Sequence, residues 1–165
     1  MKFSLFMMPL HHPTESPSLA FDRDISLIQL ADGLGYDECF IGEHHSGGWE
    51  TMPAPEMALA KASALAHRIR LGTSVISVPF HHPYYVAERM AFLDHLTRGR
   101  AILGVGPCAL VTDKVLFGLP NEKLYPMMAE SVDIIVRLLE SPEPIDHDVQ
   151  FWQFKQMRLQ LRSYQ

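Results

Sequence analysis

The feature that most constrains the fold is a regular alternation of short apolar runs with longer segments of helical period. Four such pairs occur, with expected strands at residues 2–7, 38–42, 69–78 and 101–105. Each expected strand is followed by a segment whose apolar residues recur three to four positions apart, as on one face of a helix. Because parallel strands need a crossover between them, the alternation predicts an α/β fold built of βα units on a parallel sheet.

The expected helices have recognisable ends. The first closes at Gly35, where a left-handed cap favours glycine, and the second opens at Pro55, which suits a first helical turn. A third helix is expected over residues 84–96, and a fourth over residues 127–139 after a long loop. Beyond it, β-type alternation over residues 149–161 predicts a β-hairpin.

Length and composition exclude several classes of protein. The chain has 165 residues, 47% of them hydrophobic, enough for one core. A net charge of −5 argues against a nucleic-acid partner, which would require clustered lysine and arginine. No apolar stretch approaches the roughly 20 residues of a membrane helix, so no membrane partner is expected. Cys39 and Cys108 lie in apolar or glycine-rich surroundings and predict free thiols in a cytoplasmic protein.

Three polar residues, Glu43, His44 and His45, follow the second expected strand directly. In α/β barrels the catalytic groups lie at the carboxyl ends of the strands. Burying such side chains costs free energy unless each one finds a partner or a ligand. From the residues alone, the tripeptide indicates either a catalytic group or a hydrogen-bonded trio that holds the next loop.

Three histidine pairs raise the question of a metal site, because imidazole is a common ligand of zinc and iron. They are His11-His12, His44-His45 and His81-His82. Adjacent residues of a strand point to opposite faces, so each pair offers at most one ligand to a given site. Metal binding is therefore the weaker interpretation, and we expect no metal. The pair His81-His82 is expected in a loop that enters the third helix.

Five segments, in this order and spacing, resemble the bacterial-luciferase-like flavin monooxygenases, in particular their limonene-monooxygenase-like branch. They are residues 2–9 (KFSLFMMP), 33–45 (GLGYDECFIGEHH), 68–83 (RIRLGTSVISVPFHHP), 93–107 (LDHLTRGRAILGVGP) and 151–162 (FWQFKQMRLQLR). Together they cover the whole chain, but only the front half of a family member.

The resemblance implies a TIM-like (β/α) barrel, to which this chain contributes the first four βα units and a β-hairpin. A complete barrel takes about 250 residues, so residues 1–165 are expected to be the N-terminal part of a single barrel domain, incomplete and truncated. The implied enzyme uses reduced FMN and O2 to oxygenate a small organic substrate, with a flavin reductase as electron source. By itself the chain is expected to be inactive, and its open sheet edges predict a homo-oligomer.

The resemblance also implies roles for particular residues. His44 matches the catalytic imidazole of the family, and Glu43 lies beside the flavin ring. The peptide bond between Ser74 and Val75 resembles the family's cis bond beneath the flavin. The walls of the flavin site are expected at Phe6, Ser74, Val75 and Gly106.

Two departures from the family pattern affect the expected flavin site. Cys108 stands where glycine is usual, so its β-carbon would crowd the flavin or demand an unfavourable backbone conformation. Tyr125 and Pro126 occupy the region where an arginine commonly meets the FMN phosphate. Charge-assisted contacts to phosphate are strong, so we expect weak FMN binding.

Two alternatives stay open. One is a non-catalytic remnant or subunit that pairs its open sheet edges with another chain. The other is a relative that uses the deazaflavin F420 for hydride transfer on the same fold. Flavin-dependent oxygen uptake separates the first alternative from the monooxygenase, and cofactor preference separates the second.

Overall fold

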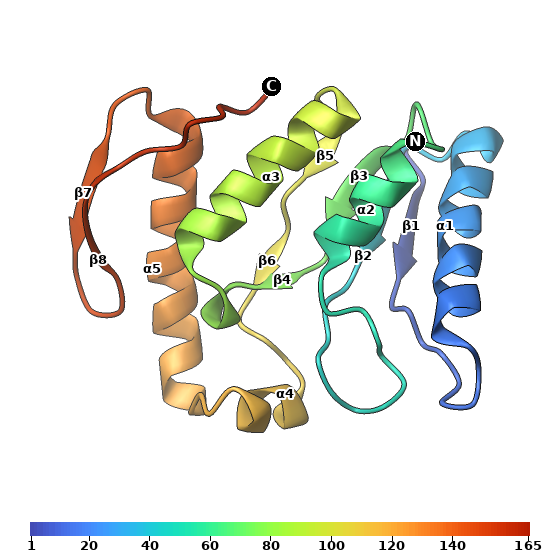
Figure 1. Cartoon of the computed structure of the whole chain (residues 1–165), viewed down its shortest axis with the longest axis horizontal. Helices are drawn as coiled ribbons and strands as arrows, with labels where there is room; N and C mark the ends of the chain where they lie inside the picture. Colours follow the sequence, from blue (N-terminus) through green and yellow to red (C-terminus); the bar gives the residue numbers. More distant parts are fainter.

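The structure, a computed structural model, describes residues 1–165. Its main sheet has four parallel strands (Figure 1), in the order β1 (Ser4–Met7), β2 (Glu38–Ile41), β3 (Arg70–Thr73) and β5 (Ala101–Ile102). The larger helices are α1 (Pro17–Leu34), α2 (Pro55–Ser63), α3 (Pro83–Thr97) and α5 (Asn121–Glu140). Strands and helices alternate as the sequence predicts, and Gly35 and Pro55 delimit helices at the expected places. The α/β fold class is confirmed.

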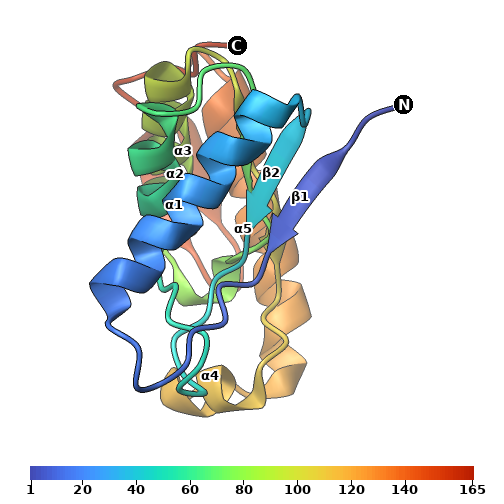
Figure 2. The same ribbon diagram turned by 90° about the vertical axis from the view of Figure 1, so that its right-hand side faces the viewer.

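The helices pack on one face of the main sheet. In Figure 2, α1, α2 and α3 lie to one side of β1 and β2. Side chains on this face, such as Cys39, Ile41 and Leu71, are fully buried. The other face carries the row Phe6, Phe40, Gly72 and Ile102, aligned across the strands by the parallel register. Phe6 is 57% exposed, so no helix covers this face.

The core lies between the sheet and the helices. Each layer contributes apolar residues to one cluster, including Ile28, Leu59, Val86 and Ile134 from the helices. Burying a side chain of this size stabilises the fold by about 1.5–3 kcal/mol. None of the helices combines the length and the apolar character that crossing a membrane requires.

The third and fourth expected strands are each interrupted. Residues 69–78 form β3 and then β4 (Ile76–Ser77), while residues 101–105 form β5 and then β6 (Val105–Gly106). Strands β4 and β6 pair in a second, two-stranded sheet. The peptide bond between Ser74 and Val75, at the break after β3, is cis, as the family resemblance implies.

The β-hairpin is present, but its position was predicted wrongly. Its strands are β7 (Ile145–Asp148) and β8 (Gln153–Met157), so the hairpin begins before the predicted range 149–161 and its turn spans residues 149–152. The carboxylate of Glu130 on α5 accepts hydrogen bonds from the backbone N–H groups of Phe151 and Trp152. This contact holds Phe151 and Trp152 in the turn, although the alternation in the sequence predicts them in a strand.

The segment before the hairpin also differs from the prediction. Helix α5 begins at Asn121, six residues before the expected position 127, and contains Pro126. Proline removes one backbone donor from a helix, yet here the helix continues through it. The expected long loop contains a short helix, α4 (Val111–Leu116), and a 3-10 turn, η1 (Val78–Phe80), precedes α3.

Candidate active site

The tripeptide Glu43-His44-His45 follows the carboxyl end of β2, as predicted. The backbone N–H of Gly42 donates to the Met7 carbonyl at 3.1 Å, and that of His44 donates to the Met52 carbonyl at 2.9 Å. These bonds fix the chain where it leaves the sheet. The three side chains then enter two different hydrogen-bond networks.

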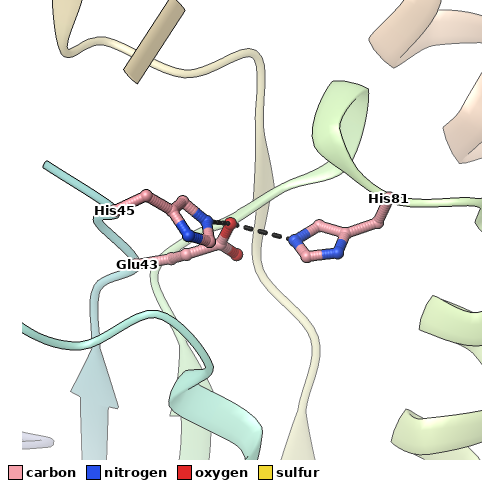
Figure 3. Close-up of side chains that lie close together, drawn as sticks. All are labelled: Glu43, His45 and His81. Carbon is pink, nitrogen blue, oxygen red and sulfur yellow. Dashed lines mark hydrogen bonds and ion pairs between the residues drawn. The ribbon is translucent and has the colours of Figure 1, made fainter. Parts of the chain in front are cut away.

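Glu43 is the centre of the first network (Figure 3). Its Oε1 atom lies 2.8 Å from Nε2 of His45 and 2.9 Å from Nε2 of His81, and its Oε2 accepts the backbone N–H of Ser77 at 3.1 Å. Glu43 is 3% exposed. Burial by itself would raise the pKa of its carboxyl, but the hydrogen bonds from His81, His45 and Ser77 outweigh it and hold the pKa below the ordinary value. Glu43 is therefore a buried anion at neutral pH.

His81 was not predicted as a site residue. His81 and His82 both lie in the connection that enters α3, as expected, and the side chain of His82 accepts the N–H of Tyr84 at 3.2 Å in the N-cap. The neighbouring His81 instead points to Glu43 (Figure 3). A signal did exist, because His81 follows the third expected strand and therefore lies at the same edge of the sheet as Glu43.

The ligand atoms of Glu43, His45 and His81 lie within 4.8 Å of one another, close enough to surround a metal ion. The surroundings of His81 oppose this arrangement. Nε2 of His81 lies 2.9 Å from the Glu43 carboxylate, which only accepts, so this nitrogen donates. A guanidinium nitrogen of Arg89, which only donates, lies 3.5 Å from the other ring nitrogen, Nδ1. A histidine that binds a metal through Nε2 has no proton on Nε2 and donates its Nδ1–H to an acceptor. We therefore propose a hydrogen-bonded carboxylate here rather than a metal centre.

His44 belongs to the second network. Its Nδ1 lies 3.1 Å from Oδ2 of Asp113, and its Nε2 lies 3.6 Å from Oε2 of Glu50. The ring retains some contact with solvent, since the side chain is 16% exposed. An imidazole held at one nitrogen by a carboxylate is suited to proton transfer at the other nitrogen.

Asp113, on α4, is a site residue that sequence analysis missed. Its carboxylate also accepts the backbone N–H of His45 and the hydroxyl of Ser46. Burial would raise the pKa of Asp113, but the bonds from Ser46, His44 and His45 outweigh it and keep the pKa below the ordinary value. No residue pattern near position 113 indicated this role, because its partners lie almost 70 positions earlier.

The residues expected to line a flavin site are brought together only in part. Val75 and Gly106 line one cavity of about 600 Å³, between β6, α4 and the start of α5. A β-carbon on Gly106 would lie 2.6 Å from Cγ2 of Val75, so this wall requires glycine. Ser74 precedes Val75 in the cis peptide but does not line the cavity, and Phe6 lies on the uncovered face of the main sheet. Glu43 and His44 are likewise outside the lining of this cavity.

Cys108 lines the same cavity and adopts the backbone conformation expected to be unfavourable for it. Its φ is 80°, in the left-handed region that favours glycine. Burial, followed by the nearby charge of Asp113, raises the pKa of its thiol, so the group is neutral. Cys39 is also a buried free thiol, and burial raises its pKa to about 12.

The family model for luciferase-like monooxygenases matches residues 1–165. The chain belongs to this family. It is 44% identical over 160 residues to 4-hydroxyprotoasukamycin monooxygenase of Streptomyces nodosus subsp. asukaensis, covering 97% of this chain and 43% of the relative. It is 42% identical over 137 residues to limonene 1,2-monooxygenase of Rhodococcus erythropolis, covering 83% of this chain and 35% of the relative.

Solved structures share the fold. The oxygenating constituent of 3,6-diketocamphane monooxygenase from Pseudomonas putida, a type II Baeyer–Villiger monooxygenase in complex with FMN, has a TM-score of 0.91 and 26% identity, covering 99% of this chain and 48% of the other. The F420-dependent tetrahydromethanopterin reductase from Methanopyrus kandleri has a TM-score of 0.77 and 22% identity, covering 99% and 47%. At that identity the reductase shows a common fold alone. The chain spans less than half the length of the curated relatives it matches.

Proposed function

We propose that this chain forms part of the active site of a monooxygenase that uses reduced FMN and O2 to oxygenate a small organic substrate. The observation that supports this most is the pair of networks at the carboxyl end of β2. They place an anionic Glu43 beside a carboxylate-held His44 in a member of the luciferase-like family. Bound reduced FMN would supply the electrons for the reaction with O2.

The residues of this chain would perform three tasks. His44 would take up or release a proton at Nε2, while Asp113 holds Nδ1. Glu43 would present a fixed negative charge at the flavin side of the site. Val75 and Gly106 would form one wall of the flavin site, in the cavity that they line. Phe6 and Ser74, which lie outside this cavity, would contact the flavin from the sheet side.

The cavity between β6 and α4 fits part of such a cofactor. Its lining is largely apolar, with Val75, Val105 and Pro107, which suits a flat ring system. It also contains a lysine, an asparagine and a tyrosine that suit a polar chain. The carboxyl ends of the strands, where these residues lie, are where α/β barrels bind their ligands.

Partners follow from the same proposal. The structural relative from Pseudomonas putida is called the oxygenating constituent of its enzyme. By analogy we propose that a separate flavin reductase supplies the reduced FMN here. F420 is the less supported cofactor, because the F420-dependent neighbour shares only the fold, whereas the relatives above 40% identity are monooxygenases.

The test combines cofactor binding with oxygen uptake. The chain is titrated with FMN and with F420. Oxygen consumption and product formation are then measured in a version of the protein completed to a full-length barrel, with a flavin reductase, NADH and a panel of terpenes and cyclic ketones. We expect FMN to bind in preference to F420, and His44→Ala to abolish product formation while FMN affinity changes less than about twofold. Exposed His12→Ala is the matched control. Absence of both FMN binding and oxygen uptake would favour the non-catalytic alternative, and preference for F420 would favour the reductase alternative.

A further inference from the structure

The cavity lined by Val75 and Gly106 contains one cationic side chain, that of Lys114 on α4. The other polar side chains in its lining are Cys108, Asn121 and Tyr125, and no carboxylate is among them. Lys114 is half-buried and takes part in none of the ion pairs of the structure. The cavity therefore has a positive charge without a partner.

Neighbouring groups do not neutralise this charge. The thiol of Cys108 is kept neutral by burial, which raises its pKa. Asp113 precedes Lys114 in the chain, but its carboxylate is bonded to His44, His45 and Ser46. The ammonium group keeps some contact with solvent, because every buried side-chain nitrogen has a hydrogen-bond partner and that of Lys114 has none. An anionic ligand group in the cavity would be its ion partner.

We propose that Lys114 binds the phosphate of the flavin nucleotide in this cavity. Lys114 would then supply the positive charge that Tyr125 and Pro126 do not provide. This inference rests on the proposed function. Tyr125 lines the same cavity as Lys114. Lys114 therefore borders the space next to the position where the family commonly has an arginine. An ammonium group is a common phosphate ligand that acts as a point charge. The apolar wall of Val75, Val105 and Pro107 is then left for the ring system.

Lys114 and Asn121 also border an adjoining surface hollow. Lys114 therefore lies at the junction of the two spaces. A ligand in the adjoining hollow alone would not contact Val75 or Gly106, whereas a flavin nucleotide spanning the cavity would contact both its wall and Lys114.

The experiment compares FMN with riboflavin, which has the same ring system without the phosphate. Both are titrated into the 165-residue chain by calorimetry, with Lys114→Gln and Lys114→Arg as variants. Lys123→Gln is the matched control, because Lys123 is exposed on α5 and outside the cavity lining. We expect Lys114→Gln to weaken FMN binding by about tenfold or more and to leave riboflavin binding unchanged. Lys114→Arg keeps the charge and should retain the preference for FMN.

The outcomes separate this inference from the proposed function. If both flavins bind and Lys114→Gln changes their affinities equally or not at all, the role of Lys114 is wrong while the flavin site stands. An equal effect of Lys123→Gln would show that net charge, and not this site, is responsible, and would also overturn the inference. If neither flavin binds the wild-type chain, the proposed flavin site itself fails, and the role of Lys114 with it.

Discussion

The Nδ1 atom of His44 lies 3.1 Å from Oδ2 of Asp113, a residue 69 positions further along the chain. This contact joins the end of β2 to α4, the short helix that follows β6. Because the same carboxylate also holds the backbone of His45 and the hydroxyl of Ser46, one buried side chain fixes three consecutive residues of the candidate site.

Replacing Asp113 should therefore destabilise the protein. Asparagine has one oxygen acceptor where aspartate has two, so Asp113→Asn leaves a buried donor without a partner. We expect a loss of about 1–3 kcal/mol in the free energy of unfolding, measured by urea denaturation. Asp133→Asn is the control, since Asp133 on α5 is 59% exposed and pairs only with Arg137. In Asp133→Asn the free energy of unfolding should change by no more than about 0.5 kcal/mol. Similar losses in both variants would contradict the role of Asp113 in holding the site.

Stability should decrease at acidic pH because of Glu43. Its folded-state pKa lies below the ordinary value of 4.5, so its contribution is complete above that value. As the pH falls further, the unfolded chain takes up a proton that the folded chain does not, and the free energy of unfolding decreases until the folded pKa is passed. We expect Glu43→Gln to show a shallower decrease than wild type as the pH falls below about 5, measured as urea midpoints. Parallel pH profiles would exclude this role.

The two cysteines should respond oppositely to glycine. At Cys108, with φ of 80°, Cys108→Gly should be about 1 kcal/mol more stable than Cys108→Ala, because a β-carbon is costly in the left-handed region. At Cys39, in β2, Cys39→Gly should be about 0.5–1 kcal/mol less stable than Cys39→Ala. Thermal or urea unfolding measures both pairs. The same order of stability at both positions would contradict the backbone conformation described for Cys108.

The cluster of Glu43, His45 and His81 should not bind zinc in the wild-type chain. Equimolar Zn²⁺ should leave the melting temperature unchanged, because Arg89 holds His81 in the tautomer that opposes coordination. Arg89→Gln removes this constraint, and Zn²⁺ should then raise the melting temperature by mass action. Adding His45→Ala should abolish the effect. A rise in wild type that disappears in His81→Ala would show that the cluster is a metal site.

The 165-residue polypeptide should associate in solution. β1 and β5 are the outer strands of the main sheet, and the face that carries Phe6 is uncovered. Unpaired strand edges and apolar surface favour association between chains. Size-exclusion chromatography with light scattering should therefore give a dimer or larger species. A sharp monomer peak with cooperative unfolding would show that the exposed face is tolerated.

Much of the fold could be predicted because its signals are local. The spacing of apolar residues predicts each helix and strand from neighbouring positions. Gly35 marks the end of α1 and Pro55 the start of α2 in the same local way. The breaks between β3 and β4 and between β5 and β6 could not be predicted, since no proline or charged residue marks them at positions 74–75 and 103–104. Helix α4, with six residues, is too short to show a helical period.

The site was predicted less completely for a different reason. Glu43 and His44 could be proposed as site residues because they follow a strand directly. His81 and Asp113 act through contacts with residues far away in the sequence, and a single sequence contains no record of such pairs. Lys114 could not be proposed from the sequence either, because only the folded chain brings it to the same cavity as Tyr125.

The sequence separations within the two networks imply an order of folding. Glu43 reaches Ser77 and His81, which lie 34 and 38 positions away, and His44 reaches Asp113 at 69. The entropy lost in closing a chain segment grows with its length, and contacts of this range form slowly. The imidazole and carboxylate groups therefore meet only after the βα units that carry them have docked. Signals from these histidines should appear in the last phase of refolding, after the helical signal has been recovered.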